Sequence, residues 1–319
     1  MKRGIKMKKL ISVILLLCLV SSCAFALTAD EAVKLGDMYF YGNNVEQDAE
    51  KAFANYMEAA EAGQLEAICR IGQLYYYGFG AELDYAKSFE WYLKAAEAGD
   101  ADAMSYIGGM YCSGIGTEQD YDKALEWFMK GAEVGNADSM RMIAQMYYFS
   151  EGVEQNYDLA FEWYCKGADA GDMHSLEMIG CMYYFGEGVE QDDVKAFEWT
   201  AKAANAGSSF AMSNLGAMYE NGEGVEKDYL KALEWYLKAA DLGEADAMYS
   251  VGHIYEMGWG VEKDEAMAAE WYAKVVESGD AVFMHDLGNL YSDSTNPEAD
   301  SKKAEEWYRK AEEAGYTEE

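Results

Sequence analysis

The sequence has few of the residues that usually carry out catalysis or bind metal ions. Its 319 residues include three histidines, His174, His253 and His285. Histidines without a fixed carboxylate partner are weak evidence for a metal site, because zinc sites use three or four ligands. The chain also lacks the G-x-S-x-G, H-E-x-x-H and P-loop motifs. We therefore predict no catalytic residue, no metal site and no cofactor.

Pairs of adjacent aromatic residues recur along the chain and could anchor a binding partner. The pairs are Phe40-Tyr41, Tyr76-Tyr77, Tyr148-Phe149 and Tyr184-Phe185, and Glu220-Asn221 stands at the next matching place. Aromatic side chains often supply much of the affinity at protein interfaces. The alternative is that they end a helix and pack beneath a loop. For any single residue the sequence slightly favours packing beneath the loop, and for the series as a whole it favours binding.

A repeat of 36 residues must position these side chains. Glycines recur at this interval from Gly63 to Gly315, and tyrosines from Tyr39 to Tyr291, with no insertion or deletion. Self-similarity at a fixed interval of this length is typical of solenoid proteins. It predicts eight repeats and a short tail at 316–319, the repeats being 28–63, 64–99, 100–135, 136–171, 172–207, 208–243, 244–279 and 280–315.

Each repeat is predicted to be a pair of helices. In the third repeat, apolar and small residues recur at helical spacing from Ala103 to Tyr111 and again from Ala124 to Gly131. The small residue Gly108 would let the neighbouring helix approach closely. Asp100 is a suitable N-cap, and the matching residues are Thr28, Gln64, Asn136, Asp172, Ser208, Glu244 and Asp280. Because neither helix can bury its apolar stripe alone, we expect an all-α solenoid, an α/α superhelix of helix-turn-helix repeats.

Three short motifs recur in these repeats: G-x-x-Y in the first helix, G-x-G in the turn, and D-x-x-x-A-x-E-W-Y followed by K-A-A-x-x-G. The last motif stands complete at Asp228, Ala232, Glu234, Trp235, Tyr236, Lys238, Ala239, Ala240 and Gly243. The unit resembles the Sel1-like repeat, a relative of the tetratricopeptide repeat, over residues 28–315. The resemblance implies a protein-binding scaffold without typical catalytic residues. Secreted bacterial members are often linked to the cell envelope or to host proteins.

The resemblance also implies where a partner would bind, since first helices line the concave groove of related solenoids. Side chains opposite the apolar stripe vary among the repeats, as those of an exposed face would. One such position reads Val33, Cys69, Ser105, Arg141, Glu177, Ser213, Tyr249 and His285. The candidate protein-binding residues on this concave face are Gln73, Tyr76, Tyr77, Arg141, Gln145, Tyr148, Phe149, Glu177, Tyr184, Phe185 and Glu220.

Four cysteines follow the N-terminal segment, each at a different place in its repeat: Cys69, Cys112, Cys165 and Cys181. A cysteine-rich secreted subset of the Sel1-like family has a disulfide within each repeat. This sequence lacks that pairing, so we expect thiols that are mostly free or buried.

Residues 1–26 are predicted to be a secretory signal peptide. Five basic residues precede an apolar run from Leu10 to Val20, which is too short to span a membrane. Ala24-Phe25-Ala26 is a typical cleavage site, and we favour cleavage after Ala26. The alternative is that Val20-Ser21-Ser22-Cys23 acts as a lipobox, which would anchor the protein through a lipid on Cys23. In both cases the protein is expected to be exported, and without a lipid it would be periplasmic or secreted.

The charge balance limits the class of partner. The chain has 58 acidic and 25 basic residues, a formal charge of −33. Removal of residues 1–26 takes away five basic and no acidic residues, which makes it −38. Such a surface opposes nucleic acids and favours basic partners. We predict a non-enzymatic exported scaffold that binds a protein or peptide, and the alternatives are an envelope hydrolase or a purely structural spacer.

Overall fold

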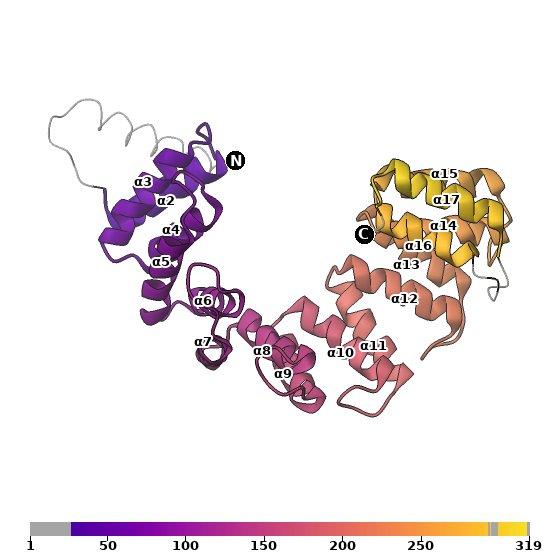
Figure 1. Ribbon diagram of the computed structural model, residues 1–319, viewed down its shortest axis with the longest axis horizontal. Coiled ribbons are helices and arrows are strands. Elements are labelled where there is room, and N and C mark those ends of the chain that lie inside the picture. The colour runs from indigo at the N-terminus through magenta and orange to yellow at the C-terminus, as the bar shows by residue number, and fades with distance from the viewer. Residues whose placement is uncertain (1–26, 293, 295–298, 318–319) are drawn as a thin grey trace, which may run out of the picture. The chain divides into compact units, whose positions relative to one another are not determined.

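The computed structural model of the protein describes residues 27–292, 294 and 299–317. These residues form sixteen α-helices and no strand (Figure 1), so the all-α prediction is confirmed. The chain divides into two compact units, residues Met1–Asn136 and Ala137–Glu319. The predicted signal peptide, with Cys23 and Ala26, lies outside the described residues.

The described part of the first unit consists of the first three repeats. Each repeat is a pair of packed helices, and each pair packs against the next within the unit. The helices are α2 (Ala29–Tyr41), α3 (Ala49–Glu61), α4 (Leu65–Tyr77), α5 (Tyr85–Glu97), α6 (Ala101–Ser113) and α7 (Tyr121–Glu133).

The second unit consists of the remaining five repeats, built in the same way. Its helices are α8 (Ala137–Phe149), α9 (Tyr157–Asp169), α10 (Met173–Phe185), α11 (Asp193–Asn205), α12 (Ser209–Asn221), α13 (Tyr229–Asp241), α14 (Ala245–Met257), α15 (Glu265–Ser278), α16 (Ala281–Ser292) and α17 (Ser301–Glu313). Even-numbered helices are therefore the first helices of the repeats, and odd-numbered helices are the second.

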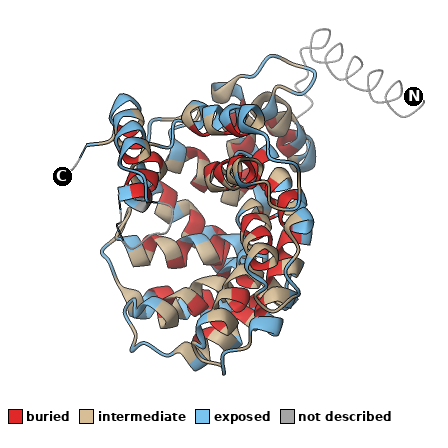
Figure 2. Cartoon of the chain, turned by 90° about the vertical axis from the view of Figure 1, so that its right-hand side faces the viewer, coloured by how far each residue is buried: buried red, intermediate tan, exposed pale blue. Residues whose placement is uncertain are grey.

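The core of each unit lies between the helices, and Figure 2 shows the buried residues on the inward sides of the ribbons. In the third repeat Ala103, Ile107 and Gly108 are buried, as the helical spacing predicts. Gly108 has the role expected of it, because a Cβ atom there would lie 2.4 Å from the Phe128 ring. The first helix thus leaves room for the aromatic side chain of the second, at a separation that a larger residue would prevent.

Side-chain caps fix where most helices begin. Asp100 accepts a hydrogen bond of 2.8 Å from the backbone N–H of Ala103, and Thr28 forms a capping box with Glu31. Gln64 and Glu244 occupy the matching position but make no side-chain cap, so that expectation is wrong for both. Their longer side chains instead reach the first helix of the preceding repeat, where Gln64 donates to Asp30 and Glu244 accepts from Ser209.

The G-x-G turn ends the first helix and folds onto the preceding repeat. Gly222 ends α12 in the left-handed conformation, and its N–H donates to the Met218 carbonyl oxygen. Gly224, the second glycine, also has a positive φ of 66° and lies against the start of α11. A Cβ atom there would lie 1.9 Å from the carbonyl oxygen of Asp193. This turn therefore fixes the position of the loop beside the end of the first helix.

Candidate functional site

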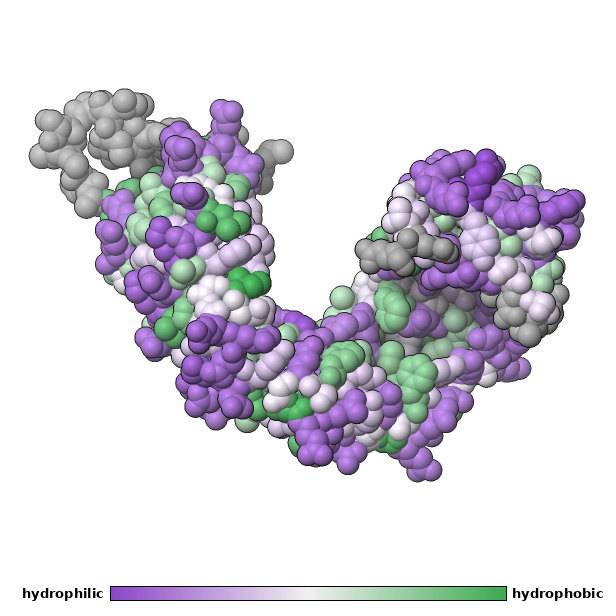
Figure 3. All heavy atoms as spheres, viewed as in Figure 1, coloured by the Kyte–Doolittle hydropathy of each residue, from purple (hydrophilic) through white to green (hydrophobic). Residues whose placement is uncertain are grey.

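The structure separates the two members of each aromatic pair. Residues at the last position of a first helix are exposed: Tyr41 by 54%, Tyr77 by 68%, Phe149 by 57% and Phe185 by 66%. Residues at the penultimate position are partly buried. Figure 3 shows hydrophobic patches in green among the mostly hydrophilic surface of each unit. We call Tyr41 and Tyr77 the exposed rings of the first unit, and Phe149 and Phe185 those of the second.

The penultimate residues pack beneath the turn or the second helix, as the alternative interpretation of the aromatic pairs predicts. Tyr76 contacts the Tyr85 ring with centroids 5.2 Å apart, and Tyr148 contacts Tyr157 at 5.1 Å. These edge-to-face contacts are typical of aromatic packing in cores. Tyr76 and Tyr148 therefore pack against a tyrosine of the second helix and also contact the exposed ring that follows each of them.

The polar candidates lie in interactions within and between repeats. Arg141 pairs with Asp138 at 2.8 Å and with Asp172 of the next repeat at 3.5 Å, and its guanidinium also donates to Gln145. Gln73 accepts a hydrogen bond from Arg70. Three candidates of the second unit, Arg141, Gln145 and Glu177, are partly buried.

A hydrogen bond with a histidine of the same helix holds Glu177. His174 lies 2.8 Å from its carboxylate, and the hydrogen bond raises the pKa of His174 above its ordinary value. Burial raises the pKa of Glu177, but hydrogen bonds with His174 and Ser208 outweigh it and lower the pKa overall. The side chain is therefore ionised near neutral pH and positioned by its own repeat and the next.

Variation among the repeats does not always mark an exposed residue. Val33, Ser213 and Tyr249 belong to the variable position that was expected to be exposed, but all three are buried. The expectation is wrong because this position also faces the neighbouring repeat. Ser213, for example, donates a 2.7 Å hydrogen bond to Asp246.

The second helices send tyrosine hydroxyl groups toward the first helices, where most meet a partner. The hydroxyl of Tyr56 donates to Asp37 at 2.7 Å, that of Tyr236 to Glu220 at 3.0 Å, and that of Tyr272 to Glu256 at 2.7 Å. The hydroxyl of Tyr164 is buried and has no hydrogen-bond partner among the described residues. In the first repeat Asp37 accepts the hydrogen bond from Tyr56, and the corresponding residue in the repeat of Tyr164 is Gln145.

We predict that Tyr164→Phe leaves the free energy of unfolding within about 0.5 kcal/mol of the wild type, or raises it by up to about 1 kcal/mol. The change removes a buried hydroxyl that has no hydrogen-bond partner to replace the water it contacts in the unfolded chain. The third repeat already has phenylalanine, Phe128, at the corresponding position. Tyr236→Phe is the matched control and should cost about 1 kcal/mol, because it breaks the bond to Glu220. Urea unfolding of the three proteins measures both effects, and an equal loss in the two variants would contradict the prediction.

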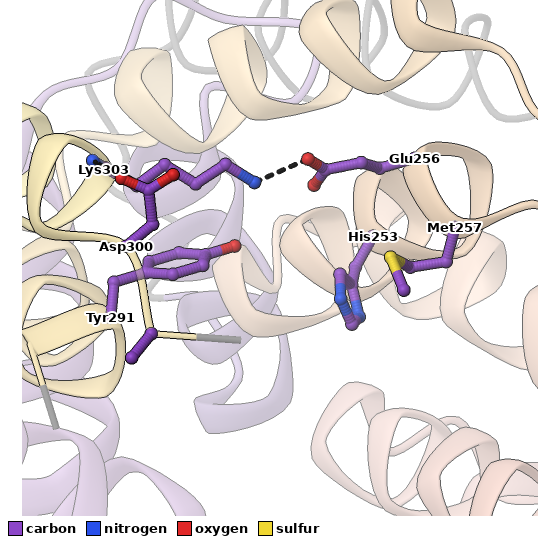
Figure 4. Close-up of a pocket in the computed structure, with 7 residues that line it drawn as sticks. His253, Glu256, Met257, Tyr291, Asp300 and Lys303 are labelled. Atoms are coloured by element: carbon purple, nitrogen blue, oxygen red, sulfur yellow. Dashed lines mark hydrogen bonds and ion pairs between the residues drawn. The ribbon is translucent and has the colours of Figure 1, made fainter. Parts of the chain in front are cut away.

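A pocket of about 250 Å³ in the second unit was not predicted from the sequence (Figure 4). It is lined by His253, Glu256, Met257, Tyr291, Ala299, Asp300 and Lys303. Lys303 and Glu256 point toward one another and form an ion pair. Burial raises the pKa of Glu256, but hydrogen bonds from Lys303 and Tyr272 outweigh it, so its pKa is lowered. This ion pair joins the last two repeats. In the sequence, the opposite charges of Glu256 and Lys303 are the signal that could have indicated the pair.

The two remaining histidines, one of which also lines this pocket, pack against aromatic rings. His253 packs edge-on against Trp259, with centroids 4.9 Å apart, and His285 stacks on Tyr316 at 4.0 Å. Among the residues that the structure describes, no three His, Cys, Asp or Glu side chains are arranged to hold a metal ion. The four described cysteines are thiols, and burial raises the pKa of Cys69 to about 12.

The repeats match a known family. The model of the Sel1 repeat matches eight segments that cover most of the chain, at residues 32–64, 65–100, 101–136, 137–172, 174–208, 209–244, 245–280 and 281–316. The chain belongs to the Sel1 repeat family. Sel1 repeat proteins are generally non-enzymatic scaffolds, and their repeats generally bind protein partners.

Two solved bacterial structures resemble this Sel1 repeat chain. A protective antigen of uropathogenic Escherichia coli with an SLR fold is 33% identical over 90% of the chain, with a TM-score of 0.73. The chain spans 62% of the length of that antigen. A Sel1 repeat protein from Oxalobacter formigenes is 31% identical, with a TM-score of 0.69, over 77% of this chain and 99% of its own. A comparison with curated protein sequences finds no match. None of the described helices is long and apolar enough to cross a membrane.

Proposed function

We propose that this Sel1 repeat protein is an exported, non-enzymatic scaffold that binds a basic protein or peptide. The binding surface is the side of each unit formed by the first helices, which is the concave face in related solenoids. The observation that carries the proposal is the exposure of large aromatic rings at the same position in successive repeats, Tyr41 and Tyr77 in one unit and Phe149 and Phe185 in the other.

Physical cost supports this assignment of the surface. A largely exposed aromatic ring gains little stability from burial, yet four of the first helices end in one. Two of these rings, Tyr77 and Phe149, lie in edge-to-face contact with their neighbours Tyr76 and Tyr148 at 5.0 Å and 4.8 Å. Rigid rings of this kind lose little conformational entropy when a partner covers them. They are therefore suited to act as anchors at an interface.

The chemistry of the partner follows from charge, and the location from the N-terminal sequence. A formal charge of −33 in the whole chain attracts basic molecules over distances of about the Debye length, roughly 8 Å in physiological salt. The basic and apolar segment before Leu27 supports export, with cleavage after Ala26 or a lipid on Cys23.

Site-specific photo-crosslinking tests the proposed function. Benzoylphenylalanine at Tyr77 or Phe185 is expected to capture a discrete protein from envelope or host extracts at both low and high salt. The matched controls are Val134 and Leu242, which are similarly exposed apolar residues at the ends of second helices. Equal capture at the four positions, or capture that high salt abolishes everywhere, would contradict the proposal and indicate nonspecific attraction.

A further inference from the structure

The residue in the middle of the G-x-G turn varies among the repeats, and at Phe79, Glu187 and Glu223 it lies beside the aromatic pair of the preceding repeat. In the first unit this residue is Phe79, whose ring contacts Phe40 with centroids 5.0 Å apart. In two turns of the second unit the corresponding residues are Glu187 and Glu223, and the turn after them has Trp259. The same architecture therefore places an apolar ring beside one aromatic pair and a carboxylate beside two others.

Contacts in the second unit show how these carboxylates are held. The hydroxyl of Tyr148 donates a hydrogen bond to the Glu187 carboxylate, and Phe149 packs edge-on against Tyr148 at 4.8 Å. One repeat further on, Phe185 packs in the same way against Tyr184 at 5.0 Å. The charge of Glu223 raises the pKa of Tyr184, which is the expected effect of a carboxylate close to its hydroxyl.

We propose that these groups form two equivalent subsites, Phe149–Tyr148–Glu187 and Phe185–Tyr184–Glu223, which bind arginine or lysine side chains of a basic partner segment. The proposal rests on the function proposed above and names the chemistry of its partner. A carboxylate oxygen that accepts one hydrogen bond from a tyrosine keeps other lone pairs for a cation. The exposed ring beside it offers its face to the same cation.

Lysines of the second unit have other partners, so the cation that binds these subsites is expected to come from another molecule. Two lysines of the second helix α11 are engaged within their own repeat: Lys195 pairs with Asp192 at 3.3 Å, and the Lys202 ammonium lies 3.5 Å from the centroid of Trp199. The first unit is the internal contrast, because Phe40 and Phe79 offer no carboxylate at the corresponding place. We therefore assign cationic side chains to the second unit and apolar ones to the first.

Fluorescence anisotropy with two synthetic peptides tests the subsites in the full chain. One peptide is four copies of Gly-Ser-Arg-Leu, and the other is four copies of Gly-Ser-Gln-Leu. The double variant Glu187→Gln with Glu223→Gln should weaken binding of the arginine peptide by about tenfold, because each subsite loses its charge but keeps a hydrogen-bond acceptor. The wild type should bind the glutamine peptide more weakly than the arginine peptide. The variant should bind the glutamine peptide with the same affinity as the wild type does.

The matched control is Glu190→Gln with Glu226→Gln, which removes the same charge from exposed positions of the same two loops. It should change binding of the arginine peptide by less than about twofold, because only diffuse attraction is reduced. An equal loss in both double variants would overturn the proposal, and so would failure of the arginine peptide to bind the wild type. Circular dichroism and the thermal midpoint confirm that each variant is folded.

The two proposals can fail separately. If a protein is crosslinked at Phe185 and its yield is the same in the Glu187→Gln, Glu223→Gln variant, the scaffold function stands and the cation subsites are wrong. If the arginine peptide behaves as expected but no protein is captured at Tyr77 or Phe185, the subsites stand and the scaffold function is wrong.

Discussion

Replacing Gly224 with alanine is expected to lower the free energy of unfolding by about 3–5 kcal/mol, a loss at the upper end for single substitutions. The added Cβ atom would lie 1.9 Å from the carbonyl oxygen of Asp193 and 2.5 Å from its carbon. These are backbone atoms at the start of α11, so the contact can be relieved only by moving the turn away from the preceding repeat. A positive φ of 66° adds strain for any residue with a Cβ atom.

Gly279→Ala is the matched control for Gly224→Ala. Gly279 lies in the same unit with a nearly equal φ of 72°, but no heavy atom lies within 4 Å of where its Cβ atom would be. Its replacement should therefore cost only the strain of the left-handed conformation, about 1–2 kcal/mol. Urea unfolding followed by circular dichroism measures both variants. Equal losses would show that the close approach of the turn contributes nothing to stability.

Local pattern was enough to predict the helices. The buried residues Ala103, Ile107 and Met110 of α6 were evident from spacing alone, because an amphipathic helix repeats its buried face every three or four residues. The close approach of a neighbouring helix at Gly108 was also predicted from its small size, and the structure shows that the Phe128 ring fills the space. Eight copies in one register make such inferences mutually consistent.

The candidate site was harder to predict, because it depends on contacts between repeats. Tyr148 and Phe149 are adjacent in sequence, yet one packs beneath Tyr157 and the other is exposed. Adjacent side chains on a helix point about 100° apart, so whether each is buried or exposed depends on where the turn and the next repeat lie. The unpartnered hydroxyl of Tyr164 likewise depends on which side chains surround it in space.

Replacing Phe149 and Phe185 together with serine is expected to weaken partner binding by about 30- to 100-fold. Each ring is more than half exposed in the free protein and would become buried against a partner. We expect truncation of each ring to cost about 1–1.4 kcal/mol, and two such losses correspond to this change in Kd. Stability should change little, because the rings make few contacts that folding depends on.

The measurement that tests the central claim most directly is an equilibrium titration of the protein captured by crosslinking at Phe185. It compares the wild type, the Phe149→Ser, Phe185→Ser variant, and a control in which Leu230 and Leu242 become serine. Both leucines belong to the same unit and are exposed to a degree similar to that of the two rings. They lie at the two ends of the second helix α13, Leu230 in its first turn and Leu242 at its C-cap. We predict a loss of at least about 30-fold for the ring variant and less than about twofold for the control. Unchanged affinity in a ring variant with intact helicity, or equal losses in both variants, would contradict the claim that the exposed rings bind the partner.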